Sequence, residues 1–162
     1  VDAQLAADAL SHYVPAGMRQ KTVIVNGVTC IEDCYNASPD SMRAALKTLH
    51  DIQGNKKIAV LADMLELGEF SEKAHRQVGE KAAQTGCEWV LTYGELSKFI
   101  TDEAQKNGCK AKSFDNKESL ADFLFRNLCD GDAVLFKGSR GMKMEEIFLS
   151  LYKKIGYDPD NT

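Results

Sequence analysis

The stretch Ile58-Ala59-Val60-Leu61 decides the fold, because it is wholly apolar and no longer than a short strand. Such a run has no polar face to turn toward solvent, which is typical of a parallel strand covered by helices on both faces. A helix is predicted on each side of this strand. Ser38-Pro39 caps and opens the first, and Ser71 caps the second, which ends near Gly86. The centre of the chain is therefore predicted to be a helix–strand–helix unit.

The same alternation continues toward the C-terminus. Short β-rich runs predict three further strands, at 89–91, 112–114 and 133–136, of which the second is an edge strand. Apolar residues at helical spacing predict a helix after each strand. These helices begin near Leu96, at a capping box formed by Asp115 with Glu118, and before Met144.

A hairpin is predicted ahead of these units. Two β-rich runs, 22–25 and 28–31, are separated by Asn26-Gly27, and this dipeptide favours a type I′ turn, which needs positive φ at both central residues. The chain is therefore predicted to be an α/β domain with a Rossmann-like open, mostly parallel sheet, helices on both faces and an N-terminal antiparallel hairpin. Such sheets bind ligands at the carboxyl ends of their strands.

Length and charge narrow the class of protein. The chain has 162 residues, of which 44% are hydrophobic and 27% charged, values that suit one soluble globular domain. Its net charge of −4 argues against a general nucleic-acid binder, and no apolar run is long enough to span a membrane. No signal peptide is recognisable. The five cysteines follow no metal or disulfide pattern, so we expect reduced thiols and a cytoplasmic location.

The first polar segment with the residue types of a site is 32–41, between the hairpin and the first helix. Asp33 and Asn36 could orient a nucleotide or a cation, and the N–H groups of the helix start favour anions. The alternative is a capping loop with no ligand, because capping by itself explains Ser38.

The second segment is 63–69, directly after the central strand. Asp63 stands where open α/β sheets often carry a catalytic or ligand-binding carboxylate, and Glu66 follows it. The alternative is a solvated acidic loop, since loops are generally polar. His75, in the following helix, is more often structural or exposed than catalytic in such a position.

The third segment is Lys137-Gly138-Ser139-Arg140-Gly141, between the last strand and the last helix. The glycines let the backbone approach a ligand, and Ser139 can donate to an anion. Lys137 and Arg140 add positive charge, arginine with a fork that fits a carboxylate or a phosphate. An anion site at the start of a helix is predicted, with a basic surface turn as the alternative.

Several common catalytic and cofactor-binding motifs are missing from the sequence. There is no P-loop motif to hold ATP phosphates and no glycine fingerprint of a nicotinamide- or flavin-binding domain, which disfavours a nucleotide-binding oxidoreductase. Serine-hydrolase and His/Glu metal motifs are also absent, and no metal ligands are predicted. From residues alone, the chain is an anion-binding α/β domain.

Three motifs together resemble the C-terminal domain of the Mur ligase family, from about Met18 to Leu151. Within that family they are most similar to the ligases that add D-alanyl-D-alanine to the UDP-N-acetylmuramoyl-tripeptide in peptidoglycan synthesis. The first two motifs depart from the family pattern at Ser38, where asparagine is usual, and at Ala62, where glycine is usual. The motifs are Asp33-Cys34-Tyr35-Asn36-Ala37-Ser38-Pro39-Asp40-Ser41-Met42, Val60-Leu61-Ala62-Asp63-Met64-Leu65-Glu66-Leu67-Gly68-Glu69 with Ser71 and His75, and Lys137-Gly138-Ser139-Arg140 with Met144-Glu145.

The resemblance implies an ATP-dependent amide ligation in which a central domain supplies the P-loop and the Mg²⁺ ligands. By the same resemblance, the C-terminal domain would close over the nucleotide, with Arg19, Asp33, Asn36 and Ser38 on the nucleotide side. Asp33 supports the domain interface. We further expect Lys137, Gly138, Ser139 and Arg140 to bind the carboxylate of the dipeptide.

The resemblance also divides the chain. Residues 1–17 would be a helix and linker from the ATPase domain, 18–156 the C-terminal domain and 157–162 a loose tail. The partners would be ATP, D-alanyl-D-alanine, the UDP-N-acetylmuramoyl-tripeptide and the N-terminal and central domains, and this domain alone is expected to be inactive. The competing hypothesis is a phospho-acceptor receiver domain, because Asp33, Asp63 and Lys137 follow predicted strands.

Overall fold

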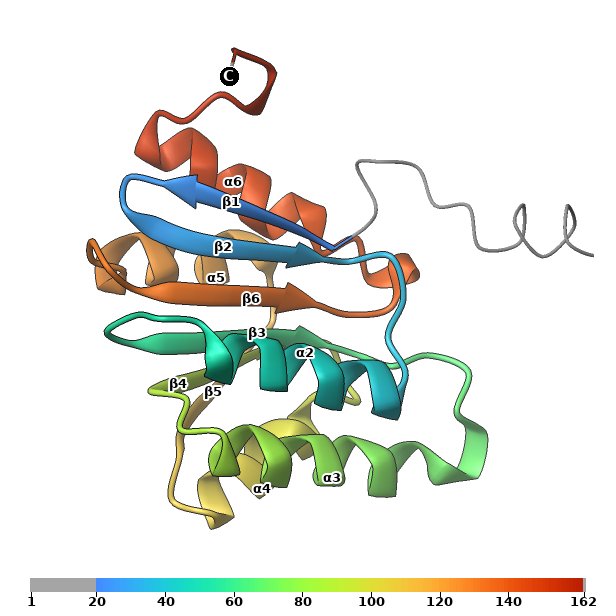
Figure 1. Cartoon of the computed structure of the whole chain (residues 1–162). Coiled ribbons are helices and arrows are strands. Elements are labelled where there is room, and N and C mark those ends of the chain that lie inside the picture. Colours follow the sequence, from blue (N-terminus) through green and yellow to red (C-terminus); the bar gives the residue numbers. More distant parts are fainter. Residues whose placement is uncertain (1–19, 162) are drawn as a thin grey trace, which may run out of the picture.

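A six-stranded sheet forms the centre of the computed structural model, which describes residues 20–161. In space the strands follow the order β1-β2-β6-β3-β4-β5, and only the β1–β2 pair is antiparallel. The arrowheads of β2, β6 and β3 point to the same edge of the sheet (Figure 1). The strands are β1 (Lys21–Val25), β2 (Val28–Asp33), β3 (Lys57–Ala62), β4 (Trp89–Tyr93), β5 (Lys110–Phe114) and β6 (Ala133–Lys137).

Helices cover both faces of this sheet, as the sequence predicts. Alternate residues of each central strand point to opposite faces, so β3 sends Val60 to one core and Leu61 to the other. Neither side of β3 meets solvent, which explains its wholly apolar sequence. One core contains α5 (Lys117–Asn127) and α6 (Glu145–Ile155), and the other contains α2 (Pro39–Asp51), α3 (Ser71–Gln84) and α4 (Lys98–Lys106).

The N-terminal hairpin is confirmed, with Asn26 at φ 50° and Gly27 at φ 78° between β1 and β2. Both values lie in the left-handed region that a type I′ turn requires. The predicted strand at 112–114 is also confirmed as part of β5, which lies at the edge of the sheet.

Two of the predicted helix starts are wrong. The box of Asp115 with Glu118 does not form, because the cap of α5 is Asn116, whose Oδ1 accepts the N–H of Ser119 at 2.7 Å. Ser71 does not cap α3, because the 3₁₀ turn Gly68–Phe70 runs directly into the helix and makes Ser71 its first residue. The prediction for Ser38 is confirmed: it caps α2 in a reciprocal box with Ser41.

The ends of the chain differ from each other. The predicted helix and linker at 1–17, and Arg19, lie outside the described residues. At the other end, in the tail predicted to be loose, Tyr157 packs edge-on against Tyr152 with ring centroids 5.2 Å apart, and Pro159–Asn161 forms a 3₁₀ turn. Over residues 20–161 no helix has the length and apolar character to cross a membrane.

Candidate functional site

The candidate site lies at the carboxyl edge of the sheet, around the end of β6. The chain leaves β2 for α2 on one face, whereas it leaves β6 for α6 on the other. Neighbouring strands whose connections diverge in this way leave a crevice in open α/β sheets. The site residues predicted from the three polar segments therefore come from loops that meet at this edge (Figure 1).

On the β3 side of β6, the loops that follow these two strands are hydrogen-bonded to each other and close the crevice. The N–H of Ser139 donates to the carbonyl oxygen of Asp63 at 3.0 Å, and the N–H of Leu65 donates to Oγ of Ser139 at 2.9 Å. Ser139 is buried, and its Oγ accepts this hydrogen bond within the protein. The anion-binding role of its hydroxyl proton stays a prediction.

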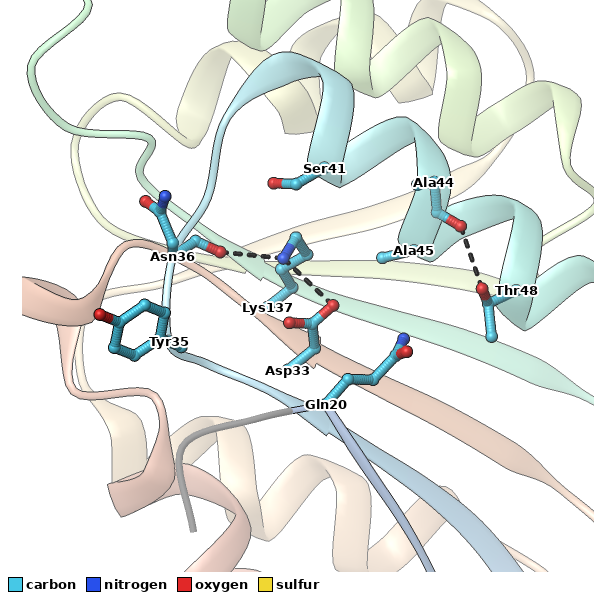
Figure 2. A pocket seen from close by; sticks show the side chains of 9 residues that line it. All are labelled: Gln20, Asp33, Tyr35, Asn36, Ser41, Ala44, Ala45, Thr48 and Lys137. Atoms are coloured by element: carbon cyan, nitrogen blue, oxygen red, sulfur yellow. Dashed lines mark hydrogen bonds and ion pairs between the residues drawn. The ribbon is translucent and has the colours of Figure 1, made fainter. Parts of the chain in front are cut away.

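Between β2 and α2 the crevice is open. It forms a pocket of about 440 Å³ beside the end of β6, walled by amide and hydroxyl side chains and by two alanine methyl groups of α2 (Figure 2). Its mixed lining suits a flat, polar heterocycle better than a bare ion. The lining residues are Gln20, Asp33, Tyr35, Asn36, Ser41, Ala44, Ala45, Thr48 and Lys137.

Lys137 spans the base of this pocket. Its Nζ lies 3.1 Å from Oδ2 of Asp33 and donates to the carbonyl oxygen of Asn36 at 2.9 Å, and Figure 2 shows the ammonium between the two. Only 3% of the Lys137 side chain is exposed, against 18% of the Asp33 side chain. Lys137 was predicted to offer its charge to a ligand, but its ammonium is already paired inside the protein.

Arg140 is the exposed cation of the third segment. Its guanidinium carbon lies 5.7 Å from the centroid of the Tyr35 ring, so the loops after β2 and β6 meet through these side chains. Within residues 20–161, Arg43 and Arg76 form ion pairs with carboxylates, whereas Arg140 forms none. An exposed guanidinium without an acidic partner is available to an anionic ligand.

The third segment does not open directly into the last helix. Arg140–Met142 forms a 3₁₀ turn, and α6 begins only at Glu145, with Glu146 beside it in the first turn. These carboxylates already occupy the positive end of the helix dipole, so α6 offers an anion no favourable N-terminus. Gly138 is not open to a ligand either, since a Cβ there would lie 2.7 Å from Cβ of Ala62.

Asp63 is neither a solvated carboxylate nor a free one. It is 6% exposed, and its Oδ1 accepts both the N–H and the hydroxyl of Ser97, at 2.8 and 2.7 Å. This carboxylate therefore ties the loop after β3 to the start of α4. A receiver domain needs an accessible acceptor carboxylate, and the burial of Asp63 disfavours that hypothesis.

His75 has a structural role, which is the more common one for a lone histidine in a helix. It is fully buried, its Nε2 accepts the N–H of Met64 at 3.0 Å, and its Nδ1 lies 2.6 Å from the carbonyl oxygen of Ser71. These contacts require Nδ1 to carry the proton. Glu66, by contrast, is exposed at φ 67° on the loop that His75 holds.

The capping interpretation of the first segment is confirmed for Ser38, whereas Asn36 makes a local contact ahead of the helix. The hydroxyl of Ser38 accepts the N–H of Ser41 at 3.1 Å, and the amide oxygen of Asn36 accepts the N–H of Ala37 at 2.8 Å. Asn36 is an exposed residue that also lines the pocket. Within residues 20–161, no three histidine, cysteine, aspartate or glutamate side chains gather closely enough to hold a metal ion.

Sequence reasoning missed several pocket residues. Tyr35 stands inside the first motif but received no role, because its partner Arg140 lies 105 residues away in the chain. Gln20 and Thr48 carry no motif signal at all. Their place in the pocket follows from the packing of α2 beside the hairpin.

Comparison with known proteins gives a consistent result. The family description "Mur ligase, glutamate ligase domain" matches residues 18–140. The UDP-N-acetylmuramoyl-tripeptide–D-alanyl-D-alanine ligase of Bacillus subtilis is 40% identical over 150 residues, which cover 90% of this chain and 33% of that protein. The ligase of the same name from Escherichia coli is 35% identical over 123 residues, covering 75% of this chain and 26% of its own length.

Solved structures agree with these relatives. A MurF structure from Acinetobacter baumannii superposes with a TM-score of 0.78 at 27% identity, covering 94% of this chain and 34% of that one. The MurF ligase of Thermotoga maritima, solved in complex with ADP, gives 0.74 at 26% identity, covering 94% and 36%. The chain thus spans about a third of the length of the relatives it matches.

Proposed function

Since this chain belongs to the Mur ligase family, we propose that it acts as the C-terminal domain of an ATP-dependent ligase that adds D-alanyl-D-alanine to the UDP-N-acetylmuramoyl-tripeptide. The names of its relatives support this choice of reaction. In the whole enzyme the carboxylate of the tripeptide is phosphorylated by ATP, and the amine of the dipeptide attacks the acyl phosphate. ATP and these precursors imply action in the cytoplasm.

The proposal includes a division of labour between the domains of the whole enzyme. A central domain would hold the ATP phosphates and Mg²⁺. Residues 1–17 would connect the two domains, and residues from 18 on would form the closing half of the site. The 162-residue chain by itself is expected to turn over no ATP and to bind it weakly, because half a cleft seldom overcomes the cost of association.

The nucleotide side of the proposed site is the pocket between β2 and α2. Asn36 and Asp33 both line this pocket, and an amide and a carboxylate can each hydrogen-bond a base or a ribose. Ser38 contributes through the fold of the helix start, where its Oγ accepts the N–H of Ser41. Arg19 precedes this pocket in the chain by one residue, next to Gln20.

Arg140 is the observation that carries the dipeptide assignment. It is exposed, it lies against Tyr35, and no carboxylate within residues 20–161 neutralises it. A C-terminal carboxylate fits the two parallel donors of a guanidinium. Gly138 and Ser139 shape the turn that carries Arg140, and Lys137 precedes this turn at the end of β6.

Substitution of Arg140 in the full-length ligase tests this assignment. Arg140→Ala is expected to raise the KM for D-alanyl-D-alanine about 10- to 100-fold, the usual value of a charge-assisted contact, with a much smaller effect on the KM for ATP. Arg126→Ala, an exposed arginine on α5, is the matched control and should change neither. Equal effects of Arg140→Ala on both KM values would refute the assignment.

A further inference from the structure

The environment of Lys137 does not fit a ligand-binding lysine. The side chain is 3% exposed, and its ammonium contacts the carboxylate of Asp33 and the carbonyl oxygen of Asn36. A buried ammonium is costly unless it is paired and hydrogen-bonded, and both conditions are met here without any ligand. The positive charge that the sequence predicts for an anion is therefore already paired within the protein.

The two contacts of Lys137 flank one residue pair of the β2–α2 loop. Asp33 ends β2, Asn36 follows three residues later, and Cys34 and Tyr35 lie between them. With both ends held by one ammonium, the backbone around Tyr35 is fixed relative to β6, the strand on which Lys137 lies. A second contact also joins this loop to β6: the thiol of Cys34 lies 3.5 Å from the carbonyl oxygen of Phe136.

Arg140 lies three residues beyond Lys137 on the same segment. The Tyr35 ring comes from the loop after β2 and the Arg140 guanidinium from the segment after β6. Lys137 joins this loop to this segment. If the tie is released, the contact of the Cys34 thiol with Phe136 remains, but Asn36 loses its side-chain link to β6. The pairing of ring and guanidinium then depends on the buried ammonium.

We propose that Lys137 is a positioning residue: it holds Tyr35 against Arg140 and so presets the guanidinium for the carboxylate of the incoming dipeptide. This inference rests on the proposed function for the identity of the ligand, but not for the arrangement of the side chains. It changes the role of the lysine from a direct anion ligand to a group that acts through Tyr35 and Arg140.

The structural half of the proposal is tested on the 162-residue chain without any ligand. Lys137→Met keeps an unbranched stem of similar length and removes the charge. Nuclear Overhauser contacts between the Tyr35 ring and the Arg140 side chain are expected in the wild type and should be lost in Lys137→Met. Folding is checked by the dispersed methyl signals of buried Leu61 and Leu135, which should remain. Retention of the Tyr35–Arg140 contacts would overturn the proposal.

The kinetic half uses the full-length ligase and separates positioning from direct binding. If Lys137 positions Arg140, Lys137→Met and Asp33→Asn should both raise the KM for the dipeptide, Lys137→Met about tenfold. The double variant should be no worse than Lys137→Met, because both changes break the same link. If Lys137 binds the anion directly, Asp33→Asn should instead free the ammonium and lower this KM, which would overturn the proposal.

The two halves also distinguish this proposal from the proposed function. Loss of the Tyr35–Arg140 contacts in Lys137→Met, in an enzyme that does not use D-alanyl-D-alanine, would refute the reaction and leave the positioning role intact. Retention of these contacts in an active dipeptide ligase would refute the positioning role alone.

Discussion

Ser97 donates both its backbone N–H and its hydroxyl to a single oxygen of Asp63, at 2.8 and 2.7 Å. The carboxylate is 6% exposed, so these contacts join the loop after β3 to the start of α4 in a buried place. A motif residue that stands where a catalytic carboxylate is expected therefore has a fold-stabilising role. The same holds for His75 and Ser139, which also use their polar atoms on the loop after β3.

Replacement of Asp63 is expected to lower stability. Asp63→Ala leaves the N–H and the hydroxyl of Ser97 without their acceptor and should cost about 1–3 kcal/mol in the free energy of unfolding. Asp63→Asn keeps an amide oxygen in place and should cost less. Urea denaturation followed by circular dichroism measures both, with Asp102→Ala, an exposed aspartate of α4, as the control. An Asp63→Ala variant as stable as this control would contradict the prediction.

Ser139→Ala tests whether this hydroxyl serves the loop after β3. Its removal leaves the N–H of Leu65 without an acceptor and should accelerate hydrogen exchange of that amide about tenfold or more, as expected for a lost hydrogen bond of at least about 1.4 kcal/mol. Amide exchange followed by NMR gives the rate residue by residue. The amide of Val90, in the neighbouring strand β4, should be unaffected. An unchanged Leu65 rate would mean that the hydroxyl does not hold this loop.

Gly138→Ala tests the close approach of β6 and β3. The new Cβ would lie 2.7 Å from Cβ of Ala62 and 3.0 Å from Cγ of Met144, so we expect a loss of about 1–3 kcal/mol from overpacking. Ala62→Gly removes the facing methyl group and should restore part of this stability in the double variant. Melting temperatures of the two single variants and the double variant measure the coupling. Strictly additive losses would show that the two sites do not collide.

Thiol reactivity should follow burial. Burial raises the pKa of the Cys30 and Cys34 thiols to about 12 and that of Cys87 to about 11, so below these values the unreactive protonated form dominates. Cys129 is exposed and should react first with Ellman's reagent at pH 8. Cys30, Cys34 and Cys87 should become fully reactive only in denaturant, and mass spectrometry after partial labelling identifies the order. Rapid labelling of Cys30 in the folded chain would be incompatible with this burial.

The fold was largely predictable because its signals are local. The apolar run at 58–61, the Asn26-Gly27 turn and the Ser38 cap each act within a few residues, and each is confirmed. The two wrong helix starts, at Ser71 and Asp115, are each a shift of one residue. There a 3₁₀ turn or a neighbouring asparagine competes for the same helix end.

The site was predictable as a set of segments but not as a set of roles. The sequence alone determined which loops meet, because the carboxyl ends of parallel strands share one edge, and it predicted Arg140 as a ligand for an anion. Only the tertiary structure decided that Lys137 pairs with Asp33, and that Ser139 and Asp63 fasten neighbouring loops. The physical reason is that folding decides which partners come within about 3 Å of a polar side chain, and so which of its donors and acceptors remain for a ligand. These partners lie far away in the sequence.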